Sequence, residues 1–241
     1  MIDIHCHILP GIDDGAQDMT AALALLKIAE AEGIRRMVLT PHIQFGRFDN
    51  SHSDIQRRLL DLQTAALDAD IGVELRAAAE VRFDSEILTL VANNTLPLYG
   101  THDGQRFMLL ELPHNHIPTG CDALVKYLRS QNITPVIAHP ERNRELQDFP
   151  DKIKTFARLG CWFQITAGSL TGNFGRTCTE LAERYLLEGH CHVVATDCHN
   201  VQYRPPHLQQ ARQRVVELMG EDKAQALFYD NPHRITATMF E

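Results

Sequence analysis

The sequence lacks several features that would assign a protein to a class directly. It has no apolar run of about 18 residues or more, so no membrane span is predicted. It begins without a basic segment followed by an apolar one, which predicts no secretory signal and a cytoplasmic location. It also lacks a basic tract. The 31 acidic residues outnumber the 23 basic ones, and the resulting net charge of -8 disfavours nucleic acid as a partner.

The six cysteines form no short Cys-x-x-Cys pair. In a cytosolic chain, this scatter argues against a disulfide framework and against a zinc site made of thiolates. A Cys-x5-Arg sequence, the pattern of cysteine-dependent tyrosine phosphatases, does run from Cys178 to Arg184. Its intervening residues include two glutamates in a helical pattern, and carboxylates there would repel a phosphate. We therefore expect Cys178 to lie on a helix without a catalytic role.

Short apolar runs alternate with longer amphipathic ones along the 241 residues, of which 44% are hydrophobic. Strands are expected at 1–4, 36–40, 72–79, 106–112, 134–139, 161–166 and 192–196. The clearest helical patterns span 20–33, 51–70 and 177–190, and further helices are expected near 119–131, 148–159, 205–219 and 221–229. Seven alternating units without a Gly-rich phosphate loop predict a closed or nearly closed parallel α/β barrel, in one domain over residues 1–241.

Polar side chains capable of binding a metal follow nearly every predicted strand. Because the C-terminal ends of barrel strands meet at one rim, we expect these side chains to lie together. Residues i and i+2 of a strand share a face, so two such pairs should stand side by side on the first and last strands. A mixture of imidazoles and carboxylates suits Mn²⁺, Fe²⁺ or Zn²⁺ in a multinuclear hydrolytic site. The candidates are His5, His7, Asp14, His42, Glu80, Glu111, His139, Asp197 and His199.

Several ordered motifs resemble the PHP (polymerase and histidinol phosphatase) superfamily: HxH at 5–7, DDG at 13–15, TPH at 40–42, HPER at 139–142, ITAGSL at 165–170 and TDCHN at 196–200. Within it, MIDIHCHILPGIDDG, PVIAHPERNRE and the later RPPH stretch are similar to bacterial manganese-dependent protein-tyrosine phosphatases of the CpsB/CapC type. Those enzymes accompany capsule and exopolysaccharide synthesis. The resemblance, which runs from Met1 to about Asn231, implies a distorted (βα)7 TIM-like barrel with the metal site at the C-terminal ends of its strands.

The same resemblance implies three divalent metal ions, manganese in this family, with iron, cobalt and zinc as alternatives. It assigns one ion to His5, His7, Glu80 and Asp197. It assigns a second to Glu80, Glu111 and His139, with Glu80 shared, and a third to Asp14, His42 and His199. The sequence has a matching residue at every one of these positions.

These expectations lead to a phosphomonoester hydrolase in which a metal-bound hydroxide attacks phosphorus. Arg142 and Arg204 are the candidates to clamp the phosphate, since a guanidinium matches it bidentately, and Arg47 and Arg144 are further candidates. By family analogy the substrate is a phosphotyrosine protein, an autophosphorylating tyrosine kinase. A small-molecule phosphatase of the same superfamily, such as one acting on histidinol phosphate, is the alternative. A metal-stabilised interaction protein without activity is disfavoured by the complete ligand set, and the oligomeric state stays open.

Three further residues near the N-terminus carry predictions. Cys6 lies between the two histidines of the HxH motif, so it should point the opposite way and pack in the core. Asp3 shares the face of those histidines and is expected to orient an imidazole from behind. Asp13 is expected to shape the turn that follows the first strand.

Overall fold

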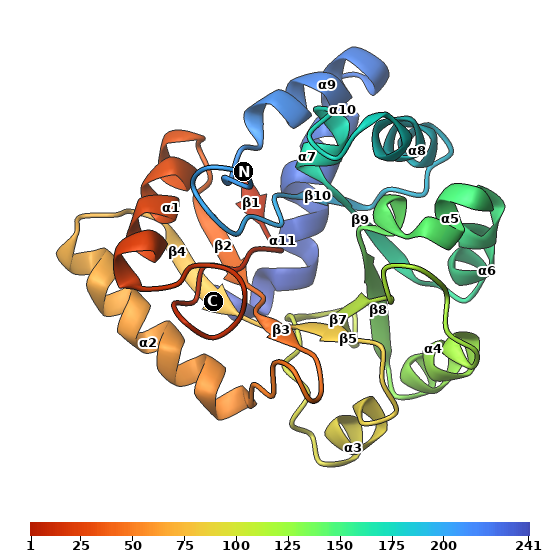
Figure 1. Cartoon of the computed structure of the whole chain (residues 1–241), viewed down its shortest axis with the longest axis horizontal. Coiled ribbons are helices and arrows are strands. Elements are labelled where there is room, and N and C mark those ends of the chain that lie inside the picture. The colour runs from red at the N-terminus through yellow and green to blue at the C-terminus, as the bar shows by residue number, and fades with distance from the viewer.

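Short parallel strands occupy the middle of the computed structural model, and helices surround them (Figure 1). The structure describes all residues from 1 to 241. One sheet has the order β1 (Ile2–Asp3), β2 (Arg36–Leu39) and β4 (Glu74–Ala77). The second has the order β10 (Val193–Ala195), β9 (Trp162–Thr166), β8 (Ile133–Ala138), β7 (Gln105–Glu111), β5 (Glu80–Arg82) and β3 (His42–Ile43). All seven predicted strands are present.

The first and last strands meet, as the barrel prediction requires. Just beyond β1 and β10, Cys6 and Cys198 form an isolated parallel bridge. The amide of Asp197 donates to the carbonyl of His5 at 2.7 Å, and the amide of His7 donates to the carbonyl of Cys198 at 2.9 Å. Together with the parallel strand order, these hydrogen bonds join the two sheets into a distorted barrel.

Three short strands depart from the expectation. The strand expected over 72–79 stops at Ala77, and Glu80 begins the separate strand β5. His42 likewise begins β3, and it lies opposite Glu80 in the parallel register. The third, β6 (Thr101–His102), forms an antiparallel hairpin with β7. The interruption at residues 78–79 carries the chain from one sheet to the other, so Glu80 lies within the strand layer instead of in a loop after it.

Most of the expected helices form close to their predicted bounds. They are α1 (Met19–Ala31), α2 (His52–Asp68), α4 (Cys121–Ser130), α8 (Arg176–Leu187) and α9 (Gln209–Met219). Side chains cap the first two, since Asp18 accepts from the amide of Ala21 and Ser51 from that of Asp54. The helix expected over 148–159 forms as a 3-10 turn, Pro150–Lys152, followed by α6 (Ile153–Arg158). A separate helix, α5 (Arg144–Asp148), precedes it, and Pro150, which cannot donate a backbone hydrogen bond, lies between the two helices.

Short helices complete the chain. Helices α3 (Ile87–Ala92) and α7 (Ala167–Leu170) were not expected, and a 3-10 turn, Pro140–Arg142, follows β8. The helix expected near 221–229 continues further than predicted. It comprises α10 (Glu221–Gln225), a π-helical segment over Ala226–Asp230 and α11 (Asn231–Thr236). No helix of the structure combines the length and the apolar character needed to cross a membrane. The cytoplasmic location and the division into one domain remain predictions.

Apolar side chains fill the barrel below its rim. Ile4 and Val136 belong to this inner cluster, and Tyr99 and Ile235 join it from outside the parallel strands. The Tyr99 hydroxyl donates to the carbonyl of Ile4 at 2.6 Å. A larger layer of apolar side chains lies between the strands and the helices, and Cys6 is buried in it, as predicted. The packed interior provides a rigid floor beneath the polar residues of the rim.

Candidate metal centre

A polar cavity of about 250 Å³ opens at the C-terminal end of the barrel, and no hydrophobic side chain lines it. Seven of the nine predicted metal ligands line this cavity directly. The other two, His5 and His7, are fully buried, and their Nε2 atoms each lie 3.4 Å from oxygens of Glu80 and Asp197. The lining residues are Asp14, His42, Gln44, Arg47, Glu80, Arg82, Glu111, His114, His139, Arg142, Asp197, His199 and Arg204.

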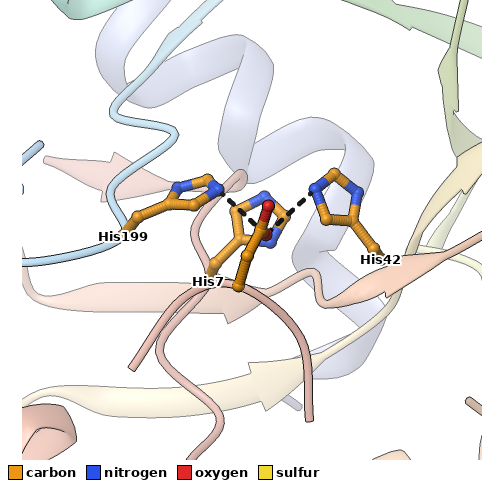
Figure 2. Close-up of side chains that lie close together, drawn as sticks. His7, His42 and His199 are labelled. Carbon is orange, nitrogen blue, oxygen red and sulfur yellow. Dashed lines mark ion pairs between the residues drawn. The ribbon is translucent and has the colours of Figure 1, made fainter. Parts of the chain in front are cut away.

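One group of four candidate ligands surrounds a common point. It comprises His7, Asp14, His42 and His199, whose nitrogen and oxygen atoms all lie within 4.8 Å of one another. Figure 2 shows His42 and His199 facing each other across His7. The Oδ1 atom of Asp14 lies 3.5 Å from Nε2 of His42 and 3.5 Å from Nε2 of His199. The three residues that the resemblance assigned to a third ion are therefore brought together, with His7 beside them.

Glu80 lies at the centre of the remaining candidates. Its carboxylate is fully buried and lies 2.9 Å from Nδ1 of His42 and 2.9 Å from Nε2 of His139, in addition to the two buried histidines. A carboxylate among four imidazoles is well placed to be shared between ions. The grouping of two residues differs from the assignment above. Glu111 clusters with Glu80 and His42, whereas His139 clusters with His5 and Asp197.

The hydrogen bonds behind His5 and His7 fix where their lone pairs point. The Nδ1 atom of His5 lies 2.8 Å from Oε1 of Gln164, and that of His7 lies 2.7 Å from Oδ2 of Asp13. The Gln164 atom is an acceptor, since it also receives the backbone amide of His139 at 3.3 Å. Both Nδ1 atoms therefore carry the proton. In the neutral rings the Nε2 lone pairs then face each other at 3.3 Å, an arrangement that only a proton or a cation can stabilise.

Unpaired buried atoms supply a second test of whether a metal fits. Nδ1 of His42, Oε2 of Glu80 and Oε2 of Glu111 are all buried without a hydrogen bond, although the first two atoms lie only 2.9 Å apart. Buried polar groups are almost always paired, so three such atoms in one cluster need an explanation. A divalent cation would satisfy all three, and the purely nitrogen and oxygen donor set suits manganese, iron or zinc. The residues present therefore fit a metal centre.

Ionisation of several of these groups suits metal binding, which requires ionised carboxylates and neutral imidazoles. Burial would raise the pKa of Asp197, but His5, Arg204 and Arg142 hold that pKa well below its usual range. Burial and the nearby Arg142 lower the pKa of His139 to about 4. Other groups differ. Despite burial, nearby carboxylates raise the pKa of His5 and His42, and Asp13 raises that of His7 well above the ordinary value. Burial and Glu80 raise the pKa of Glu111, so a metal would have to displace protons at these positions.

Two arginines from separate segments of the chain reach the candidate ligands. Arg142, in the 3-10 turn after β8, donates to Oδ2 of Asp197, and Arg204, in the loop after β10, forms an ion pair with the same oxygen. Arg47 also lines the cavity, 3.8 Å from Oδ2 of Asp14, but it is largely exposed. Arg144 is exposed and does not line the cavity, which removes it as a candidate.

The sequence reasoning missed Arg82. Its Nη1 atom donates to Oε1 of Glu111 at 2.7 Å, and the side chain lines the cavity. A signal for it was available, because Arg82 follows Glu80 by two positions and therefore shares its face of the strand.

The expectation for Asp3 was wrong, and that for Asp13 was incomplete. Asp3 contacts no imidazole. Its carboxylate accepts from the hydroxyl of Thr196 at 2.5 Å and from backbone amides, because it lies one pleat below the rim. The residue that orients the imidazole of His5 is Gln164 and not Asp3. Asp13 does shape the turn, accepting from the amide of Gly15 at 2.9 Å, and its other oxygen orients His7.

The predicted helical placement of Cys178 is confirmed, and its lack of a catalytic role stays a prediction. Cys178 lies in the first turn of α8, so no phosphate-binding loop surrounds it. Burial raises the pKa of its thiol, which makes it a poor nucleophile.

Comparison with known proteins gives consistent results. The family model described as "Capsular polysaccharide synthesis, CpsB/CapC" matches residues 1–237. The chain is 35% identical over 212 residues to the tyrosine-protein phosphatase YwqE of Bacillus subtilis, covering 88% of this chain and 82% of YwqE. It is 31% identical to the tyrosine-protein phosphatase CpsB of Streptococcus pneumoniae, with 98% of each chain covered.

Solved structures show the same relationship. A structure from work on YwqE of B. subtilis and CpsB of S. pneumoniae, described as metal-dependent tyrosine phosphatases, matches with a TM-score of 0.91 and 32% identity. The match covers 98% of this chain and 94% of that one. The phosphotriesterase homology protein of Escherichia coli matches with a TM-score of 0.60 at 12% identity, which shows a shared fold alone.

Proposed function

This chain belongs to the CpsB/CapC family of capsular polysaccharide synthesis, and we propose that it is a metal-dependent protein-tyrosine phosphatase. One observation carries the proposal. Nine candidate metal ligands and two arginines gather in and directly beneath a single polar cavity, where buried nitrogen and oxygen atoms make no hydrogen bond within the chain. Relatives of 31% to 35% identity bear the name tyrosine-protein phosphatase.

Three divalent ions, manganese by preference, would be held by the nine side chains. We assign the first ion to His5, His7, Glu80 and Asp197, and keep the assignment of the other two ions that the family resemblance implies. The position of the Glu80 carboxylate among four imidazoles supports this assignment. When bound, such ions act as Lewis acids and lower the pKa of water toward neutrality, which supplies a nucleophile. Gln164 and Asp13 hold two imidazoles in the tautomer that leaves Nε2 free for a metal.

Binding of the phosphate falls to the arginines. Four of them line the cavity, and they equal in number its four carboxylates, Asp14, Glu80, Glu111 and Asp197. The chain's own charges therefore balance there, so bound cations would make the cavity positive inside a protein of net charge -8. Arg142 and Arg204 converge on Asp197 and would grip two phosphate oxygens, because a guanidinium donates in a fork that matches them.

Hydrolysis of an aryl phosphate needs little protonation of the leaving oxygen by a side chain. A phenol has a pKa of about 10, so phenolate departs with little help from a proton donor. The physiological substrate would be a phosphotyrosine protein, an autophosphorylating tyrosine kinase of capsule or exopolysaccharide synthesis. The support for this partner is the family's link to capsular polysaccharide synthesis.

The test is to strip the protein with a chelator, add back Mn²⁺, and compare a phosphotyrosine peptide with histidinol phosphate. We expect turnover of the peptide that depends on Mn²⁺, with a metal content near three ions per chain. His139→Ala should abolish turnover, whereas His102→Ala, at an exposed hairpin away from the cavity, should not. Full turnover in excess chelator would falsify the metal dependence. Preference for histidinol phosphate would favour the small-molecule alternative.

A further inference from the structure

The loop between α7 and α8 places an aromatic ring against both arginines of the cavity. The guanidinium carbon of Arg142 lies 4.5 Å from the centre of the Phe174 ring, and that of Arg204 lies 5.7 Å from it. Phe174 is half-buried and does not line the polar cavity. It instead lines a second cavity, of about 250 Å³, which Arg204 also reaches. The Phe174 ring therefore contacts the two guanidiniums from outside the polar cavity, whereas Asp197 contacts them from inside it.

The loop has a shape that brings this ring close. Gly172 and Gly175 both have left-handed φ angles, of +89° and +84°, which other residues rarely adopt. The amide of Asn173 donates back to the carbonyl of Gly168 at 2.8 Å and closes the turn. A methyl group added at Gly168 would lie 2.9 Å from Cε2 of Phe174, which is closer than atoms pack. The glycine of the ITAGSL motif thus makes room for the ring.

A buried carboxylate fixes this loop relative to the turn that carries Arg142. Glu141, the neighbour of Arg142, is fully buried, and its Oε1 accepts from the hydroxyl of Ser169 at 2.7 Å and from the amide of Thr166 at 3.0 Å. Both partners belong to the start of α7, from which the loop continues. The HPER and ITAGSL segments are therefore held together as one unit beside the cavity.

We propose that Phe174 is a positioning residue, which stacks on Arg142 and Arg204 and holds their guanidiniums in place to bind a phosphate. A guanidinium is attracted to the face of an aromatic ring, and the ring also limits the rotamers that two long side chains can adopt. Without the ring, Asp197 alone would hold the two guanidiniums, more of their ordering would have to accompany phosphate binding, and affinity would fall. This inference rests on the proposed function, since it assigns the phosphate to these two arginines.

The experiment is calorimetric titration of inorganic phosphate into the Mn²⁺-loaded protein, alongside kinetics on an aryl phosphate. Phe174→Leu keeps an apolar side chain but removes the ring face. We expect it to raise the Kd of phosphate and the KM about tenfold, equivalent to about 1.4 kcal/mol, with a smaller change in kcat and an unchanged metal content. Phe174→Tyr keeps the ring and should retain the wild-type affinity.

Two further variants make the result decisive. Phe149→Leu is the matched control, since Phe149 stacks with Lys152 at 4.9 Å outside the cavity, and it should leave phosphate binding unchanged. Gly168→Ala displaces the ring without altering it and should weaken phosphate binding even if Phe174→Leu fails to fold. Wild-type phosphate affinity in either the leucine or the Gly168 variant overturns the proposal, as does an equal loss in the control.

The same data separate this inference from the proposed function. If the wild-type protein binds phosphate in a Phe174-dependent way but hydrolyses no phosphotyrosine peptide, the function fails and the positioning role stands. If it hydrolyses the peptide and Phe174→Leu binds phosphate normally, the positioning role alone fails. A wild-type protein that binds no phosphate refutes the positioning role.

Discussion

Replacing Gln164 by leucine should weaken metal binding and also destabilise the fold. The Gln164 side chain is fully buried on β9. Its oxygen accepts two hydrogen bonds, one from Nδ1 of His5 at 2.8 Å and one from the amide of His139 at 3.3 Å. Leucine is similar in size but offers no acceptor. His5 would then lose the partner that fixes its tautomer and its ring orientation. His139 has a left-handed φ of +32°, and it would lose one of the contacts that hold this unusual conformation.

Loss of a residue that orients a metal ligand typically costs about 10- to 100-fold in metal affinity. In the metal-free protein, Nδ1–H of His5 and the amide of His139 are left without an acceptor, at about 1–3 kcal/mol each. Nε2 of Gln164 is itself buried without a partner, so its removal offsets about the penalty of one such group. The net loss of stability of the metal-free protein should therefore be about 1–3 kcal/mol.

Metal affinity is measured by competition with a chelator, and stability by urea unfolding of the metal-free protein. Gln164→Glu keeps an acceptor and should retain more affinity than the leucine variant. Thr134→Val is the control. It removes the partly buried hydrogen bond that Arg129 of α4 donates to Thr134, near the start of β8 and away from the cavity, and it should leave metal affinity unchanged. A leucine variant with wild-type metal affinity would refute the reasoning.

Three more predictions test separate parts of the structure. Cys178→Ala should keep the wild-type kcat/KM on an aryl phosphate, and a large loss would revive a thiol mechanism. Tyr99→Phe should cost about 1–3 kcal/mol in urea unfolding, because it leaves the buried carbonyl of Ile4 without its donor, and turnover should not change. Burial lowers the pKa of His192 to about 4, and its Nδ1 accepts from the amide of Phe163 at 3.2 Å, so the fold requires the neutral ring. The resulting stability is complete above the ordinary pKa of about 6.5 and is lost as the pH falls toward 4. Relative to His192→Gln, the wild-type protein should lose about 1–3 kcal/mol between pH 7 and 4 in urea unfolding, and parallel pH profiles would contradict this assignment.

The sequence was sufficient to predict the barrel and the residues at its rim. Short apolar runs identify the seven main strands, patterns of period 3.6 identify most helices, and motif order assigns the family. Histidines and carboxylates at strand ends are conspicuous, since few structural roles need so many of them in one place. Short strands such as β3 escaped prediction because two residues carry no periodic signal.

The supporting residues could not be predicted in the same way. Gln164 lies in an apolar strand sequence, and nothing local indicates that its oxygen meets two histidines from other strands. Asp3 was given an imidazole partner because it shares the face of His5, but reach along the strand decides the contact, and Thr196 is nearer. Phe174 gave no signal either, because its two arginine partners lie far away in the sequence.

The seam where the first and last strands meet determines how early in synthesis the metal site can form. Asp3 and Thr196, which hydrogen-bond across this seam, are separated by 193 positions. His5 and His7 are synthesised long before Asp197 and His199. No nascent chain that stops before His199 contains the complete ligand set, so a metal met early would find only part of its site. Contacts of this separation also form slowly in folding. Full metal loading is therefore expected only after the first and last strands have paired and the barrel has closed.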